Sequence, residues 1–235
     1  MQDRYVGDIG DYFKYGLLRA LSPSRRLGVA WYLYPDEGHN RDGKHVSYLK
    51  KPLIWRKYDP ELFDVLKNLV EVKNRSVASV QKSGILGSVL FSDNILEVGS
   101  KFNYAQRVAW RRAWVNQTLK DLKTCDLVFA DPDNGLCEDE KYKFGTIKKW
   151  KSLPLCEGLS LSQGRPAILF HHNTRFSGGH KSENRYWCER LGKGTLALNW
   201  RAFGSRTFFL VNFDRVLQNR VKVFVNSWGT KVDLT

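Results

Sequence analysis

The sequence lacks several features that would assign it to a protein class directly. Its four cysteines form neither a Cys-x-x-Cys pair nor a zinc-ligand spacing, which argues against a structural zinc site and predicts reduced thiols. No apolar run approaches the roughly 18 residues of a membrane span, and the polar start of the chain contains no apolar signal region. There is no internal repeat and no Gly-x-Gly-x-x-Gly loop. These absences predict a cytoplasmic protein that has no membrane partner.

Positive charge is what the chain has in excess. Lysine and arginine outnumber aspartate and glutamate by 38 to 24, which gives a formal net charge of +14 over 235 residues. A field of this sign attracts polyanions, most commonly nucleic acid, although an excess of charge also serves solubility alone. With 42% hydrophobic residues the chain can build one sizeable core, and we expect a single α/β domain over residues 1–235.

The order of apolar segments predicts the fold class. Continuous apolar runs at 28–34, 126–130 and 167–170 are typical of strands that are buried on both faces. Helical signals lie around them at 11–21, 59–73, 103–123, 139–153 and 182–191. The segments 206–213 and 221–228 have the spacing of an antiparallel hairpin. We therefore expect a Rossmann-like, doubly wound fold, in which a mostly parallel sheet has helices on both faces and a C-terminal hairpin at 206–228.

Polar side chains follow each of the three buried runs. Ligands of open α/β sheets bind outside the carboxyl ends of the parallel strands, so these side chains are expected to converge. The first run leads into Asp36, Glu37 and His39, the second ends at Asp131, Asp133 and Asn134, and the third ends at His171 and His172. The last two sets are the candidate catalytic residues.

The segment 131–135 is the most specific of these signals. Asp131 ends a buried run, Pro132 stiffens the next step, and Gly135 permits a positive φ. An ordinary turn has a similar composition but needs no additional acid before the proline. For the two histidines, alternation along a strand allows only one ring to face the site easily.

Two other segments carry candidate ligand-binding groups. The loop 35–45 brings acid, imidazole and amine together, which suits a metal ion, a ribose or acid–base chemistry as well as a solvated loop. The segment Gly7–Lys14 places Asp8, Asp11 and Lys14 about one helical turn apart, and Asp11 is expected to cap the helix.

Basic and aromatic residues supply candidate contacts to nucleic acid. Arg107, Trp110 and Arg111 share a helix face that could neutralise phosphates and stack on bases. Arg175 and Lys181 belong to a basic segment, 173–185, which is expected to close over an anionic ligand as a loop. A core helix whose arginines extend to solvent, and an ordinary surface loop, are the structural alternatives.

Two of these motifs resemble motifs of a known enzyme family. The Asp-Pro-Asp-Asn segment after an apolar strand resembles the Asp-Pro-Pro-Tyr motif of N6-adenine methyltransferases, whose polar groups hold the amine to be methylated. The run Gly-Asp-Ile-Gly-Asp-Tyr-Phe-Lys at 7–14 resembles the Gly-Asn-His-Ala-Asp-Val-Leu-Lys stretch of the RlmJ-like 23S rRNA adenine methyltransferases. The terminal hairpin is similar to the antiparallel last strand of class I methyltransferases.

The resemblance implies a methyltransferase-like protein that acts on nucleic acid, with adenine N6 as a candidate acceptor. S-adenosylmethionine would be the cofactor, and its candidate ligands are Gly7, Asp8, Asp11, Lys14, Asp36, Glu37 and His39. Asp131 and Asn134 would lie near the target amine.

The same residues allow two other functions. A metal-dependent nuclease or phosphohydrolase would bind Mg²⁺, Mn²⁺ or Zn²⁺ through Asp36, Glu37, His39, Asp131, Asp133 and His171. This alternative accounts for the histidines better than a methyltransferase does. A non-catalytic protein that binds nucleic acid is the other alternative, because the segment 35–43 replaces the glycine-rich cofactor loop expected after the first strand.

Overall fold

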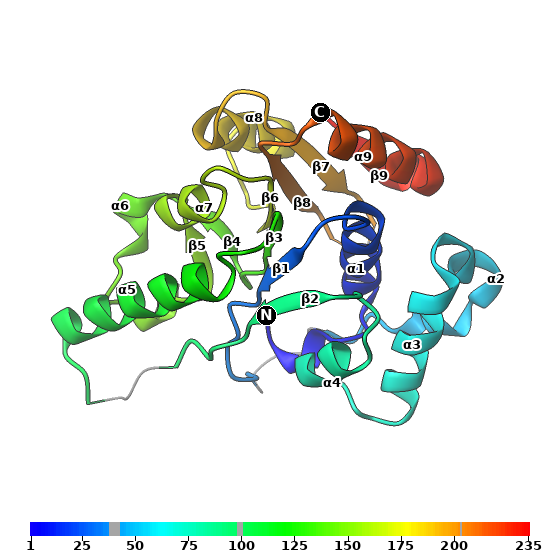
Figure 1. Ribbon diagram of the computed structural model, residues 1–235, viewed down its shortest axis with the longest axis horizontal. Coiled ribbons are helices and arrows are strands. Elements are labelled where there is room, and N and C mark those ends of the chain that lie inside the picture. The colour runs from blue at the N-terminus through cyan, green and yellow to red at the C-terminus, as the bar shows by residue number, and fades with distance from the viewer. Residues whose placement is uncertain (38–42, 98–100, 203) are drawn as a thin grey trace.

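A seven-stranded sheet forms the centre of the molecule in a computed structural model, which describes residues 1–37, 43–97, 101–202 and 204–235 (Figure 1). Its strands lie in the order β2 (Val89–Ser92), β1 (Leu27–Ala30), β3 (Leu127–Ala130), β6 (Ala167–His172), β8 (Arg206–Val211), β7 (Leu196–Trp200) and β9 (Val232–Leu234). The sheet is mostly parallel, because only β8 and β9 run against the other strands. The short strands β4 (Gly135–Cys137) and β5 (Ser152–Pro154) form a separate parallel pair.

The three strands expected to be buried are adjacent in this sheet. β1 pairs with β3, and β3 pairs with β6, in both cases in parallel. All residues of β1 and β3 are buried, as their continuous apolar runs predict. The predicted convergence of the three carboxyl ends at one edge of the sheet is therefore confirmed.

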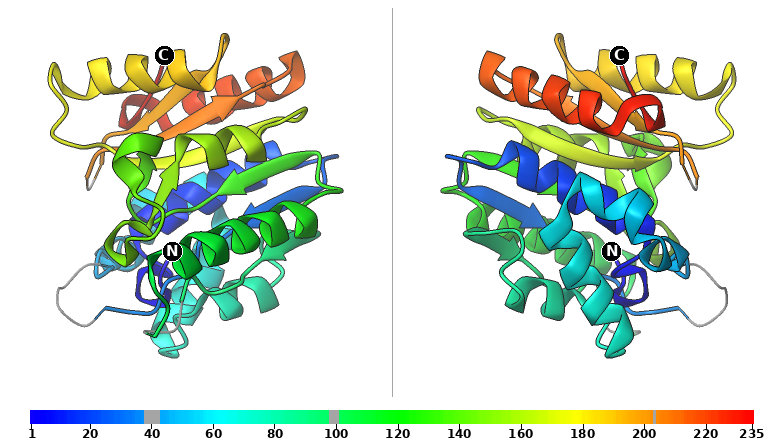
Figure 2. Two further views of the ribbon diagram at one scale, coloured as in Figure 1. Left: turned by 90° about the vertical axis from the view of Figure 1, so that its left-hand side faces the viewer. Right: turned by 90° about the vertical axis from the view of Figure 1, so that its right-hand side faces the viewer.

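Helices cover both faces of the sheet, as predicted (Figure 2). One face packs against α1 (Ile9–Leu21), α3 (Pro60–Glu71) and α9 (Arg215–Trp228), and the other packs against α5 (Tyr104–Asp121), α7 (Leu155–Leu161) and α8 (Gly179–Leu191). The connections contain α2 (Pro52–Trp55), α4 (Val77–Lys82) and α6 (Asp139–Tyr142), and the 3₁₀ turns η1 (Asp3–Tyr5), η2 (Ser47–Lys50), η3 (Arg56–Tyr58), η4 (Ile147–Lys149) and η5 (Gly229–Lys231). Within the described ranges, no helix combines the length and the apolar composition needed to cross a bilayer.

Capping side chains explain where several helices begin. Asp59 accepts a hydrogen bond from the Leu62 amide at 3.1 Å and precedes a proline at the first position of α3, as its sequence predicts. In α1 the cap differs from the prediction, because Asp8 accepts the hydrogen bond and the Asp11 amide donates it, at 2.9 Å. The helix therefore begins at Ile9 rather than at residue 11.

The prediction of a hairpin at 206–228 is wrong in its second half. Residues 215–228 form helix α9, and β8 pairs instead with β7, a strand that the apolar pattern does not predict. Alternating apolar residues within 221–228 imitate a strand. Over the longer segment, the buried residues Leu217, Val221, Phe224 and Trp228 recur at helical spacing.

The prediction of a lysine-rich helix over 139–153 is also wrong. Only Asp139–Tyr142 is α-helical, and a turn, η4 and the start of β5 follow it within the range. Lys143 ends the helix in the left-handed region, with a φ of 53°. The chain then turns, with a hydrogen bond from the Thr146 amide to the Lys143 carbonyl, and Gly145 lies so close to the Tyr104 ring that a Cβ there would collide with it.

Candidate functional site

A cavity of about 380 Å³ lies at the carboxyl ends of β3 and β6. Four segments that are distant in sequence form most of its wall: the start of α1, the segment after β3, the end of β6 and the start of β8. They contribute Asp8, Gly10, Asp11, Lys14, Asp131, Pro132, Asp133, Asn134, Phe170, His172 and Arg206. The structure thus brings the predicted catalytic residues after β3 together with part of the predicted cofactor set.

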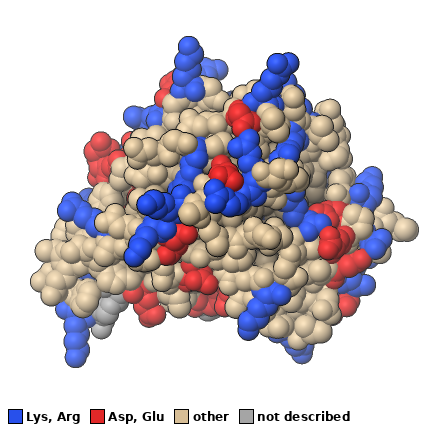
Figure 3. All heavy atoms as spheres, in the orientation of Figure 1, with Lys and Arg blue, Asp and Glu red and all other residues tan. Residues whose placement is uncertain are grey.

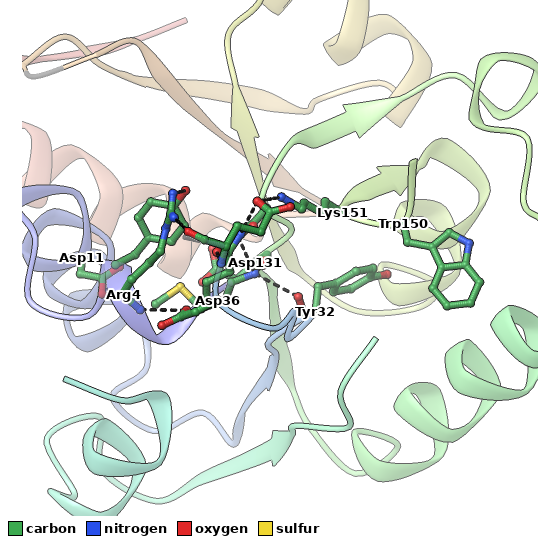
Figure 4. Close-up of polar contacts among 12 residues, drawn as sticks. Arg4, Asp11, Tyr32, Asp36, Asp131, Trp150 and Lys151 are labelled. Carbon is green, nitrogen blue, oxygen red and sulfur yellow. Dashed lines mark hydrogen bonds and ion pairs between the residues drawn. The ribbon is translucent and has the colours of Figure 1, made fainter. Parts of the chain in front are cut away.

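Lys14 joins two buried carboxylates in this wall. Its Nζ lies 2.7 Å from Oδ2 of Asp131 and 2.8 Å from Oδ1 of Asp11. The close-up of Figure 4 shows how these two aspartates approach from different elements, α1 and the end of β3. Oδ1 of Asp131 receives no hydrogen bond from any residue that the structure describes, so it is available to a group in the cavity.

Burial and charge act in opposite directions on this cluster. Burial raises the pKa of both Asp131 and Asp11, and the Lys14 ammonium opposes the increase. Burial alone would lower the pKa of Lys14, but the two carboxylates outweigh it and raise that pKa. Lys14 is therefore protonated, and its charge holds both carboxylates in place.

A second ionic contact fixes Asp133. The amino group of Met1 lies 2.9 Å from Oδ1 of Asp133 and donates to the main-chain oxygens of Tyr32 and Asp131, at 3.0 and 3.1 Å. Gln2 donates to the same carboxylate. Burial would raise the pKa of Asp133, but the Met1 amino group outweighs it and lowers that pKa. Asp133 is consequently an anion whose oxygens are already occupied.

Three other predicted cofactor residues that the structure describes, Gly7, Asp36 and Glu37, do not line the cavity. Asp36 accepts a hydrogen bond from the Arg4 amide at 3.2 Å (Figure 4), and Glu37 forms an ion pair with Lys151. Gly7 packs against Val70 instead. The predicted ligand His39 lies outside the described residues. Among the members of the predicted cofactor set that the structure describes, Asp8, Asp11 and Lys14 line the cavity.

The two histidines of β6 point in opposite directions, as alternation along a strand requires. His172 lines the cavity. His171 is fully buried, its Nδ1 accepts a hydrogen bond from the Leu136 amide at 3.0 Å, and its Nε2 lies 3.1 Å from Oε1 of Glu183. Nε2 therefore carries the proton. His171 positions the segment after Asn134, and the prediction that it is catalytic is wrong because its ring lies away from the cavity.

Close packing against the His171 ring requires a glycine at position 135. Gly135 has a φ of 75°, in the left-handed region that favours glycine, and a Cβ there would lie 2.6 Å from Nδ1 of His171. The residue thus lets the chain turn directly from the Asp131–Asn134 segment into β4 while passing next to the histidine ring.

Glu183 accepts the hydrogen bond from Nε2 of His171. Replacement of Glu183 by glutamine is expected to make the free energy of unfolding less dependent on pH. Burial would raise the pKa of Glu183, but hydrogen bonds from His171 and Thr174 outweigh it and lower that pKa to about 2. Because the pKa is depressed in the folded state, the stabilisation is complete above the unfolded value of 4.5 and is lost as the pH falls toward 2. Glu183→Gln should cost roughly 3 kcal/mol at pH 7 and about half of that at pH 3, as measured by urea unfolding.

Glu189→Gln is the matched control for this measurement, because Glu189 is exposed on the same helix α8. It should change the free energy of unfolding by less than about 0.5 kcal/mol at either pH. An equal loss at pH 7 and pH 3 for Glu183→Gln would contradict the expected role of the Glu183 charge.

His172 and Arg206 face each other across the β6–β8 pair, where they are direct partners in the register. Partial burial of its ring and the charge of Arg206 lower the pKa of His172 to about 3, so the ring is neutral near pH 7, although the residue as a whole remains exposed at the end of β6. Nη1 of Arg206 is buried and has no hydrogen-bond partner among the described residues. It lies against Gly10, where a Cβ would come within 2.6 Å of it. A buried guanidinium N–H without a partner indicates a place for an anionic oxygen of a ligand.

The predicted metal site is not assembled. Across the described ranges, no three His, Cys, Asp or Glu side chains are placed to hold a metal ion. Instead, Asp131 pairs with Lys14, Asp133 with Met1, Glu37 with Lys151, and His171 with Glu183. The side chains that would bind Mg²⁺, Mn²⁺ or Zn²⁺ are thus directed to partners within the protein.

The basic face predicted on α5 packs inward. Arg111 is fully buried and forms an ion pair with Glu157 at 2.7 Å, so the prediction that it binds nucleic acid is wrong. Trp110 stacks on Trp150 with ring centroids 4.9 Å apart, and Arg107 donates to a main-chain oxygen at 2.6 Å. This face therefore packs against the protein, as the structural alternative of a core helix expects, but Arg111 does not extend to solvent as that alternative expects.

The remaining candidates for nucleic-acid binding are accessible. Arg175 and Lys181 are exposed, although residues from Gly179 onward belong to helix α8, so the predicted loop 173–185 is shorter than expected. On the face drawn in Figure 3, lysine and arginine side chains are spread over the whole outline. This distribution attracts polyanions in general without selecting one binding face.

Arg206 is a charged cavity residue that sequence reasoning misses. It opens β8, and its place opposite His172 depends on the antiparallel register between β8 and β6. A single sequence contains no signal for that register.

No known family model matches the chain, and no curated protein is similar to it at a significant level.

Proposed function

We propose that this protein is an S-adenosylmethionine-dependent methyltransferase that acts on nucleic acid, with an exocyclic base amine such as adenine N6 as the acceptor. The observation that carries this function is the Asp131 carboxylate. It follows a central strand, Lys14 holds one of its oxygens at 2.7 Å, and its other oxygen has no partner in the described part of the chain. The two motifs that resemble methyltransferase motifs, 7–14 and 131–134, thus share one cavity.

The topology supports a Rossmann-like, class I methyltransferase fold. The parallel strands β2, β1, β3 and β6, with helices on both faces, form the arrangement in which ligands bind at the carboxyl ends. The antiparallel strand β8, which lies between β6 and β7, corresponds to the antiparallel last strand that the resemblance implies. One sheet with strands from residue 27 to residue 234 also supports a single domain.

The charges of the cavity fit S-adenosylmethionine. The volume of about 380 Å³ lies within the range of roughly 300–1,000 Å³ that is typical of small-molecule sites. The unpartnered Nη1 of Arg206 suits the carboxylate of the cofactor, and the carboxylate of Asp8 suits its ammonium or sulfonium charge, whereas both oxygens of Asp11 are taken by Lys14 and Tyr15. When bound, the cofactor supplies an electrophilic methyl group.

The other residues of the wall would act on the acceptor. Oδ1 of Asp131 would accept a hydrogen bond from the amine N–H, which orients the nitrogen and increases its electron density. The Lys14 ammonium holds this carboxylate in place and opposes the increase in its pKa that burial causes. Asn134, exposed at the cavity, offers an amide oxygen to the same amine, and the neutral ring of His172 accepts a hydrogen bond without adding charge.

Calorimetric titration with S-adenosylmethionine tests this proposal. We expect saturable binding, and we expect Arg206→Gln to weaken it by roughly 10- to 150-fold, because a hydrogen bond to a charged group contributes about 1.5–3 kcal/mol. Arg26→Gln is the matched control, since Arg26 precedes β1 at the opposite end of the strands and pairs with Asp126. It should leave the Kd unchanged.

Two other results would favour the alternative functions. If the cofactor does not bind, but Mg²⁺, Mn²⁺ or Zn²⁺ binds saturably and Asp131→Ala abolishes that binding, the metal-dependent nuclease is the better assignment. If neither the cofactor nor a metal binds, the non-catalytic protein that binds nucleic acid is the better assignment.

A further inference from the structure

The segment 50–57 presents an apolar side chain that is almost entirely exposed. Leu53 is 95% exposed and its neighbour Ile54 is 50% exposed, both on the single turn of α2. A lone exposed leucine is common on protein surfaces and carries little information. Two further properties distinguish this one: its backbone is fixed, and positive charges surround it.

The backbone beneath Leu53 is attached to α1. Trp55 is buried, and its main-chain oxygen accepts a hydrogen bond from the Tyr12 hydroxyl at 2.8 Å. Its ring meets the Tyr48 ring edge-on, with centroids 6.2 Å apart. Tyr12 lies in α1, the helix whose first turn lines the cavity. Leu53 is therefore held in a defined place relative to the cavity.

Positive charges lie on both sides of the apolar pair. Lys50, Lys51 and Lys57 are exposed, and none of them forms an ion pair within the described ranges, whereas Arg56 pairs with Asp64. In Figure 1, α2 lies at the outer edge of the molecule beyond α3, and at that edge of Figure 3 tan atoms protrude between blue lysine and arginine side chains, with red acidic side chains further inward. Such a tip fits a partner that offers both negative charge and apolar surface.

The chain that leads into the segment 50–57 passes the cavity. His45 lines the cavity, and its main-chain oxygen accepts a hydrogen bond from the Ile9 amide at 3.1 Å. Eight residue steps lead from His45 to Leu53, which span at most about 29 Å. That is the length of roughly nine base pairs of a duplex. One nucleic-acid molecule can therefore reach both the tip and the cavity.

We infer that Leu53 and the three flanking lysines form a docking element for base-paired nucleic acid, in which the leucine enters between stacked bases and the lysines contact phosphates. The inference rests on the proposed function, which gives the unstacking a purpose: Asp131 is only 2% exposed, so a base must leave its stack to reach it. Leucine and isoleucine act as such wedges beside basic side chains in proteins that bend nucleic acid. A membrane suits the segment less well, because one helical turn is far shorter than the apolar face of an interfacial helix.

Binding of short RNA and DNA duplexes that carry a fluorescent base analogue tests the docking element. We expect Leu53→Ala to weaken the binding of at least one duplex by roughly 5- to 30-fold and to reduce the fluorescence increase caused by unstacking. Lys51→Gln should lower both the affinity and the slope of its salt dependence. Val223→Ala is the matched control, because Val223 is 70% exposed on α9, and it should change neither quantity.

Three results would overturn the docking element. They are equal affinities of the wild type and Leu53→Ala for both duplexes, failure of the wild type to bind either duplex, and a loss in Leu53→Ala that is confined to vesicles containing phosphatidylglycerol. Leu53 does not line the cavity, so Leu53→Ala should keep the wild-type Kd for S-adenosylmethionine. The calorimetric titration therefore decides the proposed function separately.

Discussion

Replacement of Asp131 by alanine is expected to lower kcat for methyl transfer by about 10²–10³-fold while leaving the Kd for S-adenosylmethionine within about threefold. The reason is that, in the proposed function, Oδ1 of Asp131 would accept from the acceptor amine, whereas Arg206 and Asp8, elsewhere in the cavity wall, would bind the cofactor. Lys14 keeps its second partner, Asp11, at 2.8 Å, so the wall of the cavity should persist in the variant. Single-turnover transfer of a labelled methyl group to nucleic acid, combined with calorimetry, measures both quantities.

Asp126 provides a control on the same strand. It precedes β3 at the amino end, is partly exposed and pairs with Arg26 at 3.2 Å, whereas Asp131 follows the carboxyl end. Asp126→Ala should therefore retain wild-type kcat. Full activity of Asp131→Ala, or an equal loss in both variants, would show that Asp131 has no specific role in the transfer.

Replacement of Arg111 by methionine is expected to lower the free energy of unfolding by about 3–5 kcal/mol, the usual cost of leaving one member of a buried ion pair without its partner. Arg111 is fully buried, and its Nε and Nη2 lie 2.8 and 2.7 Å from the two oxygens of Glu157. It also donates to the main-chain oxygens of Trp150 and Ser152, at 3.1 and 3.3 Å. Urea unfolding at neutral pH measures the loss.

The neighbouring residue is the control for this prediction. Arg112 is exposed on the same helix, so Arg112→Met should change stability by less than about 0.5 kcal/mol. The double variant Arg111→Met/Glu157→Leu should be more stable than Arg111→Met alone, because it removes the unpaired carboxylate. If Arg111→Met and Arg112→Met are equally stable, the ion pair between Arg111 and Glu157 does not stabilise the fold as expected.

The parallel half of the sheet could be predicted because its signals are local. β3 and β6 are continuous apolar runs, which is the pattern of strands that are covered on both faces. The Asp59–Pro60 pair marks the start of α3 within two residues. Once the strands are parallel, the approach of Asp131 and His172 follows from the direction of the chain.

The antiparallel half could not be predicted in the same way. Strand β7 pairs with the next strand, β8, but the polar Asn199 interrupts its apolar pattern, and the pairings of β8 with β6 and of β7 with β9 join segments that are distant in sequence. Helix α9 contains a short alternating stretch, and only its packing against α1 selects the helical period. Local periodicity gives no answer where two periods fit one segment equally well.

The candidate site shows the same division between local and distant information. A sequence reveals that Asp131 follows a strand, but not that Lys14 neutralises it. The basic face of α5 looks like a surface for polyanions until Glu157 is placed against Arg111. Charged residues can therefore be assigned to the site or to the core only after the tertiary contacts are known.

The packing of α1 has a consequence for the synthesis of the chain. The ring centroid of Phe13 lies 4.3 Å from that of Trp200 and 4.9 Å from that of Trp228. These two tryptophans follow Phe13 in the sequence by 187 and 215 positions. At roughly 5–20 residues per second, the ribosome would add these partners about 10–40 s after Phe13. The first long helix to be made is thus among the last to be covered, and its apolar face is a natural target for chaperones that bind nascent chains.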